Sequence, residues 1–377
     1  MISRMRATAI AGSIVIILFT HHPVQPASVA YDLTINEQQV NFTGKPVQGM
    51  TINGGIPGPT LRFKEGDTAR IRVHNNMNVA TSIHWHGVLV PPGMDGVPYL
   101  SFPPIEPGTV FTYEFPIRQS GTYWYHSHTG TQQQVGVYGA MVIEPFQDAS
   151  KPDHDHVVML SDWTDEEPHE VSRTLKRGSE WYALKKGSAQ SIFGAASLGR
   201  LGDYFARELQ RMPAMDIADV AYDRFLVNGK PETMLPAAPG ETVRLRIIDG
   251  SSTTYFHLEF AGGPMTIVAA DGQDVEPIQK TRFLIGAAET YDVLVHVPSA
   301  GMHEFRATAH DGSGYASVWI GAGERNPAPD LPKPNLYHGM GHHGLKQIFS
   351  LTPAGTMGMP DHDVEAGKFD QPGMMGM

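Results

Sequence analysis

The chain of 377 residues contains no cysteine. It therefore cannot form a disulfide bond, and it cannot build the thiolate-ligated copper site of electron-transfer proteins. Positive charge is also scarce, because 28 Lys and Arg residues stand against 39 Asp and Glu residues, giving a formal net charge of -11 and a pI near 5.9. This balance argues against a nucleic-acid-binding protein, which would need clustered basic residues on one face.

Long hydrophobic runs are absent, apart from one at the N-terminus. Arg4 and Arg6 precede an apolar segment from Ala7 to Phe19, and Ser28-Val29-Ala30 has the small residues of a signal-peptide cleavage site. The apolar segment is too short to span a bilayer comfortably. We therefore expect residues 1–30 to be a secretory signal peptide, with the mature protein in the periplasm and not inserted in the membrane.

Two histidine pairs are the most informative motifs: His84-Trp85-His86 and His126-Ser127-His128. Alternate residues of a strand share one face, so each pair presents two imidazoles on the same face. Two such pairs brought together would place four imidazoles around one cavity, which suits a copper cluster. Single pairs of this form also occur as ordinary strand residues and in barrel hydrolases, but a barrel needs helices between its strands and this region offers almost none.

The chain divides into four regions by composition. After the signal peptide, residues 31–147 have the short β-branched and aromatic runs of a β-sandwich, with strands expected at 70–74, 110–115 and 138–143. Residues 148–325 return to this pattern after a partly helical insertion at about 162–219, which includes a helical patch at 201–209. Residues 326–377 are rich in Pro, Gly, Met and His and poor in branched apolar residues, which predicts a disordered tail or linker.

The two sandwich regions repeat one pattern, since Asn53-Gly54 is matched by Asn228-Gly229. We expect the second copy to be structural, because no histidine falls at the four positions of the paired histidines. The residues there are Leu258 and Phe260, when Thr68 is aligned with Thr242, and Arg306 and Thr308, when Gly121 is aligned with Gly301.

Three segments resemble the first-domain signature of the multicopper oxidases. They are Ser82-Ile83-His84-Trp85-His86-Gly87, Met94-Asp95-Gly96-Val97-Pro98 and Gly121-Thr122-Tyr123-Trp124-Tyr125-His126-Ser127-His128. The resemblance extends over roughly residues 33–320 and looks strongest to the periplasmic copper-resistance branch. It implies an all-β fold of two tandem cupredoxin-like (plastocyanin-like) Greek-key β-sandwiches.

The same resemblance implies roles for individual residues. His84 would ligate a type 2 copper, whereas His86, His126 and His128 would ligate a type 3 copper pair. Asp95 resembles an acidic residue near the oxygen channel of the family, although a simple turn role is equally consistent with its Gly-Met-Asp-Gly loop. In the family a third domain supplies four more histidines and the cysteine of the type 1 copper, and none of these motifs occurs in this chain.

Two functions follow from the resemblance. The first is the N-terminal part of a copper-resistance oxidase, whose complete form would oxidise Cu(I) or a phenolic substrate and reduce dioxygen to water. The second is a non-catalytic protein that sequesters copper. A separate subunit supplying the third domain is a lesser alternative. Since the chain stops inside a segment that resembles a linker, a truncated sequence is favoured over a natural end at Met377.

Further histidines and methionines are candidates of a different kind. Thioether and imidazole are soft or borderline ligands that favour copper, so the tail either recruits copper or is only a linker. Its candidate ligands are Met340, His342, His343, Met357, Met359, His362, Met374, Met375 and Met377. Four histidines without paired spacing are expected to be ordinary strand or loop residues: His74, His257, His296 and His310.

Overall fold

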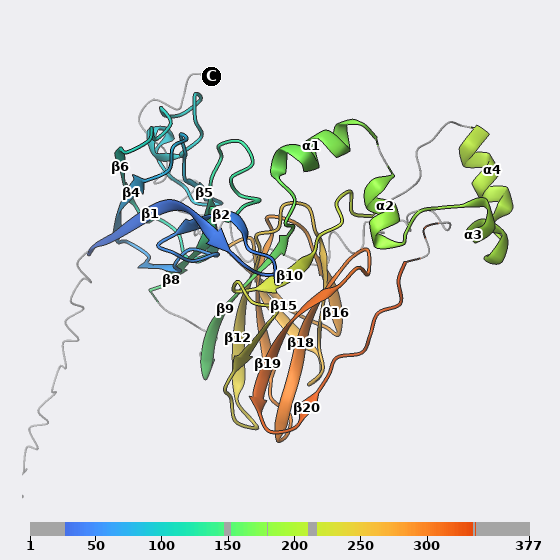
Figure 1. The fold of residues 1–377 in the computed structure, drawn as a ribbon. Helices are drawn as coiled ribbons and strands as arrows, with labels where there is room; N and C mark the ends of the chain where they lie inside the picture. The colour runs from blue at the N-terminus through green and yellow to red at the C-terminus, as the bar shows by residue number, and fades with distance from the viewer. Residues whose placement is uncertain (1–26, 147–151, 179, 210–216, 335, 337–377) are drawn as a thin grey trace, which may run out of the picture.

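The computed structural model describes residues 27–146, 152–178, 180–209, 217–334 and 336. In this part of the chain, two β-sandwiches follow one another, and four α-helices lie to one side of them (Figure 1). This confirms the predicted all-β class with a partly helical insertion. The tail residues proposed as copper ligands, from Met340 onward, lie outside the described residues.

The first sandwich is built from two four-stranded sheets with the orders β2-β1-β4-β6 and β3-β8-β7-β5. Its strands are β1 (Ser28–Val40), β2 (Val47–Ile52), β3 (Leu61–Lys64), β4 (Thr68–Asn75), β5 (His84–His86), β6 (Val110–Pro116), β7 (Gly121–His126) and β8 (Tyr138–Glu144), with a short 3-10 helix η1 (Pro92–Met94).

The second sandwich has one sheet of order β10-β9-β12-β17-β14-β15 and another of order β11-β19-β18-β13-β16, to which β20 adds beside β18. Its strands are β9 (His154–Trp163), β10 (Arg224–Val227), β11 (Glu232–Leu235), β12 (Thr242–Asp249), β13 (Phe256–Phe260), β14 (Met265–Ala270), β15 (Gln273–Lys280), β16 (Arg282–Ile285), β17 (Thr290–His296), β18 (Gly301–Ala309), β19 (Tyr315–Ala322) and β20 (Arg325–Asn326).

The helices lie between β9 and β10. They are α1 (Pro168–Lys176), α2 (Trp181–Lys186), α3 (Ile192–Ser197) and α4 (Leu201–Leu209), the last confirming the predicted helical patch. A buried ion pair of 3.2 Å between Lys186 and Asp311 holds α2 against the second sandwich. By contrast, α3 and α4 project away from the sheets (Figure 1). The helical region begins after Trp163, because Asp162 and Trp163 still belong to β9.

Alternation of apolar and polar residues explains how each sheet forms a core. In β4, Ile71 is buried, whereas its neighbours Arg70 and Arg72 are exposed. Trp85 obeys the same rule in β5, since it is fully buried and packs edge-on against Tyr113 with ring centroids 5.0 Å apart. The histidines on either side of Trp85 therefore point to the opposite face. The other predicted strands are also found, at 70–74 in β4, 110–115 in β6 and 138–143 in β8.

The predicted cleavage site lies inside a strand. Ser28, Val29 and Ala30 pair with the start of β4 in parallel register. Cleavage after Ala30 would remove these pairs, so the position of the cut stays a prediction, as does the signal peptide. Within the described residues, no helix has the length and apolar character needed to cross a membrane.

The structure corrects the alignment of the two repeats. The sheet orders β3-β8-β7-β5 and β11-β19-β18-β13 correspond, so β13 takes the place of β5 and β18 that of β7. Leu258 and Phe260 are buried in the core of the second sandwich. They therefore share the face of Trp85 and do not match the paired histidines. A register shift of one residue moves every side chain to the other face, which is why an alignment anchored at Thr68 and Thr242 fails here.

The two sandwiches share a polar contact centred on Arg246 of β12. Its guanidinium donates to Oγ1 of Thr122 in β7 and to Asp292 in β17, both at 3.0 Å, and to Asp155 in β9 at 2.7 and 2.8 Å. Thr122 also donates to Asp292 at 2.5 Å. Because β7 carries His126, this network fixes the second sandwich to the strand that holds the histidines.

Candidate metal centre

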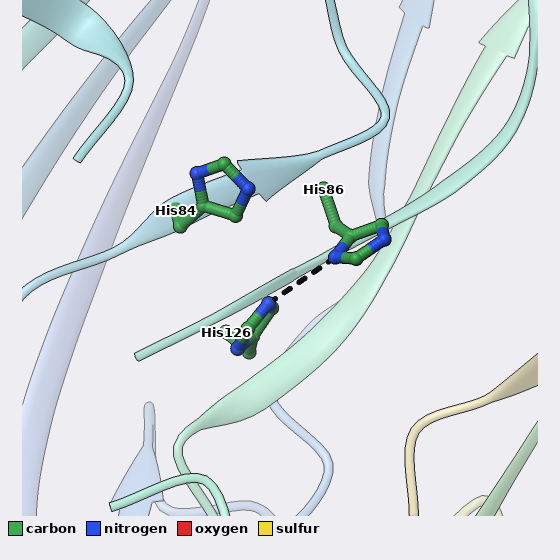
Figure 2. A group of neighbouring side chains, drawn as sticks. All are labelled: His84, His86 and His126. Carbon is green, nitrogen blue, oxygen red and sulfur yellow. Dashed lines mark hydrogen bonds between the residues drawn. The ribbon is translucent and has the colours of Figure 1, made fainter. Parts of the chain in front are cut away.

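The two histidine pairs come together on neighbouring strands. His84 and His86 lie on β5, which pairs antiparallel with β7 so that His84 is directly opposite His126. The two strands therefore present these three imidazoles on one face of the sheet, as Figure 2 shows. His128 follows β7 by two residues and lies at the exposed end of the group.

Distances define a compact group of three rings with a fourth beside it. Single nitrogen atoms of His84, His86 and His126 all lie within 4.8 Å of one another. The ring of His128 is centred 5.2 Å from that of His84 and 5.6 Å from that of His126. All four predicted histidines thus surround one region, with the first three arranged most tightly.

Hydrogen bonds set the orientation of two rings. Nδ1 of His84 donates to the backbone oxygen of Asp95 at 2.7 Å, and Nδ1 of His126 donates to that of Ser127 at 3.1 Å. With Nδ1 protonated, Nε2 of each ring carries the free lone pair. Nε2 of His126 lies 3.4 Å from Nδ1 of His86 (Figure 2). Two nitrogens about 2 Å from one tetrahedral ion are about 3.3 Å apart, so this spacing fits shared ligation.

Burial favours the neutral form of three of the imidazoles: His86, His126 and His128. It lowers the pKa of His86 to about 4, helped by the neighbouring imidazoles of His84 and His128. It lowers the pKa of His126 to about 3 and also lowers the pKa of His128. A metal ion binds the unprotonated ring, so at neutral pH no proton has to leave these residues before binding.

Trp124 forms the wall of the group, although sequence analysis did not assign it a role. Its ring stacks on His126 with centroids 4.2 Å apart and on His86 at 5.0 Å. Trp124 is almost fully buried and limits the movement of both imidazoles. Its position two residues before His126, on the same strand face, was the available signal.

Buried polar residues hold the loop that carries His128. Oε1 of Gln132 accepts from Thr81 at 2.7 Å and from Ser127 at 2.8 Å. Oγ of Ser82 accepts from the backbone N–H of His128 at 3.0 Å. The loop after β7 is thus tied to the segment immediately before β5. The sequence pattern gave no sign of the role of Gln132, because its partner Thr81 comes from a distant segment.

Replacing Gln132 with alanine should loosen this loop. The Gln132→Ala variant leaves the buried hydroxyls of Thr81 and Ser127 without their shared acceptor, at an expected cost of about 1–3 kcal/mol in the free energy of unfolding. Denaturant unfolding measures this loss. The control is Gln39→Ala on an exposed position of β1, which should change stability by less than about 0.5 kcal/mol. Equal effects of the two variants would contradict the role of Gln132.

Asp95 contacts the group through its backbone and its side chain. Besides the backbone bond to His84, its carboxylate Oδ1 lies 3.4 Å from Nδ1 of the same ring. Asp95 directly follows η1, and Gly96 adopts a positive φ of 77° with no room for a Cβ, because that atom would lie 1.8 Å from the backbone oxygen of Ile83. The turn therefore presses Asp95 against β5.

The donor set fits copper. Several neutral imidazoles on one face are ligands typical of copper and other borderline transition metals, whereas magnesium and calcium prefer carboxylate and carbonyl oxygens. Hydrogen bonds orient the rings of His84 and His126, and Trp124 stacks on the rings of His86 and His126. Such support orients ligands before an ion arrives.

The chain is similar to known multicopper oxidases. A family model described as "Multicopper oxidase" matches residues 34–148, and a second model with the same description matches residues 154–320. Copper resistance protein A from Escherichia coli is 44% identical over 90% of this chain and 58% of its own length. Copper resistance protein A from Pseudomonas syringae pv. tomato is 47% identical over 76% of this chain and 48% of its own length.

Solved structures agree on the fold. The multicopper oxidase Fet3p, which functions in iron import, superposes with a TM-score of 0.65 at 24% identity, covering 87% of this chain and 57% of that chain. A multi-copper oxidase from Pseudomonas thermotolerans gives a TM-score of 0.60 at 24% identity, covering 82% of this chain and 68% of that chain. The present chain spans about half the length of the curated relatives it matches. By its two matched domains and these relatives, the chain belongs to the multicopper oxidase family, in the copper-resistance branch.

Proposed function

We propose that this chain is the copper-binding N-terminal part of a periplasmic copper-resistance oxidase. The observation that carries the proposal is the group of three imidazoles, with His128 beside them, on the face shared by β5 and β7. In this assignment His84 holds a type 2 copper, and His86, His126 and His128 hold one side of a type 3 pair. The chain contributes no type 1 copper, since it has no cysteine.

The residues of the chain would do four things for such a centre. The imidazoles bind metal, and the backbone oxygens of Asp95 and Ser127 fix two of the rings by accepting hydrogen bonds from their Nδ1–H groups. Trp124 excludes water from one side of His86 and His126. The Asp95 carboxylate is placed to hold or deliver a proton next to His84. Copper bound there would supply one-electron redox chemistry, which in the complete oxidase is coupled to reduction of dioxygen to water.

A second candidate function is copper sequestration without turnover. It is favoured by one observation: these 377 residues contain no cysteine, so by themselves they offer no type 1 site through which electrons from Cu(I) or a phenol could enter. In that function the four paired histidines would bind copper together with the Met/His-rich tail at 326–377. Both functions share the same centre in the first sandwich, and they differ in catalysis.

Oxygen uptake tests the two functions. The chain loaded with copper should bind metal yet consume dioxygen no faster than the same amount of free copper, with either Cu(I) or a phenol as reductant. A full-length product, obtained if the reading frame continues past the codon for Met377 into a cysteine-containing domain, should turn over both. Turnover by the chain of 377 residues alone would contradict the assignment of a half site.

A further inference from the structure

The second sandwich has its own counterpart of the histidine face. His126 and Tyr138 form the last pair of the β7–β8 ladder, and Thr308 and Tyr315 form the last pair of the β18–β19 ladder. Thr308 therefore corresponds to His126. Its partner on β13 is His257, just as the partner of His126 on β5 is His84. His257 thus occupies the position of His84.

The same register assigns the remaining two positions. Two residues beyond Thr308 lies His310, which corresponds to His128, and two residues beyond His257 lies Glu259, which corresponds to His86. The second sandwich therefore keeps two of the four imidazoles. At the other two positions it has the carboxylate of Glu259 and the hydroxyl of Thr308 in place of imidazoles. This revises the expectation that all four positions had lost their ligands.

The two retained imidazoles have the geometry of their counterparts. The rings of His257 and His310 are centred 4.9 Å apart with an interplanar angle of 88°. The rings of His84 and His128 are centred 5.2 Å apart at 76°. His84, His257 and His310 are half-buried, and His128 is exposed. The arrangement that brings the first pair around a metal centre is thus repeated in the second sandwich.

A cavity of about 170 Å³ lies against the second pair, lined also by Thr308 and Arg282. A volume of this size holds an ion with several water molecules. Arg282 would repel a cation if its charge were unbalanced, but its Nε donates to the Glu259 carboxylate at 2.9 Å. The charges of these two residues offset each other, which leaves the imidazoles as the dominant ligands.

We propose that His257 and His310 form a second, weaker copper site on the second sandwich, with Thr308 and water completing the coordination. Among divalent first-row ions, nitrogen ligands bind Cu(II) most strongly. Two protein nitrogens hold an ion less firmly than the three of the first sandwich. The site lies outside the family's domain 1 centre and does not depend on the oxidase function proposed above.

Chemical modification of individual histidines measures copper binding at this site separately from binding at any other site. Diethylpyrocarbonate acylates unliganded imidazole nitrogen, and mass spectrometry of peptides reports the reaction at each histidine. Copper(II) added to the full chain should slow modification of both His257 and His310, whereas the exposed His296 of β17 should react at an unchanged rate. In His310→Gln, copper should no longer protect His257. Unchanged modification of both residues at every copper concentration would overturn the proposal.

A gain of affinity provides the complementary test. Thr308→His introduces an imidazole at the position of His126, directly opposite His257. The copper concentration that gives half-maximal protection of His257 should fall by about tenfold or more. No change in this concentration in a folded variant would count against a metal site. Protection by inorganic phosphate but not by copper would instead identify an anion site formed with Arg282, and would also overturn the proposal.

The modification rates of His257 and His310 are measured on peptides of the second sandwich. A negative result there would therefore not contradict the proposed copper centre of the first sandwich. Loss of copper at His84, His86 and His126 would likewise leave the protection of His257 and His310 unchanged. The two proposals can therefore fail independently.

Discussion

Replacing both His86 and His126 with alanine is expected to weaken copper binding at the first-sandwich centre by about 100-fold or more. These two residues supply the nitrogens that lie 3.4 Å apart, and they stack on Trp124. The variant keeps His84 and His128, whose ring centroids are 5.2 Å apart, so only a weak residual site remains. Competition titration against a copper chelator measures the change in affinity.

The control for this experiment is His296→Ala, which removes an exposed imidazole of the second sandwich. This variant should leave the copper affinity of the first-sandwich centre unchanged. A chain shortened to end at residue 336 removes the predicted ligands of the tail, and in that background the double variant should lose copper at this centre. The same copper stoichiometry in the shortened chain with and without His86 and His126 would refute the assignment.

Loss of Arg246 should produce the largest change in stability. Arg246→Ala leaves the carboxylate of Asp292, which is 8% exposed, without its cationic partner and removes both bonds to Asp155. Breaking a buried ion pair in this way costs about 3–5 kcal/mol. The midpoint of denaturant unfolding should fall accordingly. Because Thr122 loses its donor, the strand carrying His126 should also be held less firmly against the second sandwich.

Arg70→Ala is the matched control, since Arg70 pairs with Glu114 at 3.6 Å on the exposed face of β4. Both side chains of that pair are more than half exposed, so solvent screens the interaction and its loss should cost less than about 1 kcal/mol. If the two arginine variants unfold at the same midpoint, the buried network does not hold the sandwiches together.

Short-range patterns in the sequence were sufficient for much of the fold. Alternation predicts that the two histidines of a pair share one face, and the structure confirms this for His84 and His86, with Trp85 between them in the core. The helix at 201–209 was predicted from its periodicity and is found as α4. These features depend on residues close together in the chain, for which the periods of strand and helix are decisive.

Features that depend on register could not be predicted in the same way. The proximity of His257 and His310 requires β13 and β18 to be neighbours in a fixed register. The sequence alignment of the two repeats was off by one residue at β13, so it did not place His257 at the position of His84. Gln132 was missed because its partner Thr81 is distant in the chain. Trp124 was visible two residues before His126, but stacking on two rings from different strands appears only once the strands are paired.

Anomalous diffraction at the copper absorption edge, from crystals of the copper-loaded protein, tests the central claim most directly. The account predicts copper peaks within bonding distance of ring nitrogens of His84, His86 and His126, the group whose nitrogens lie within 4.8 Å of one another. Copper peaks confined to other positions, with these three rings ordered and unliganded, would contradict it.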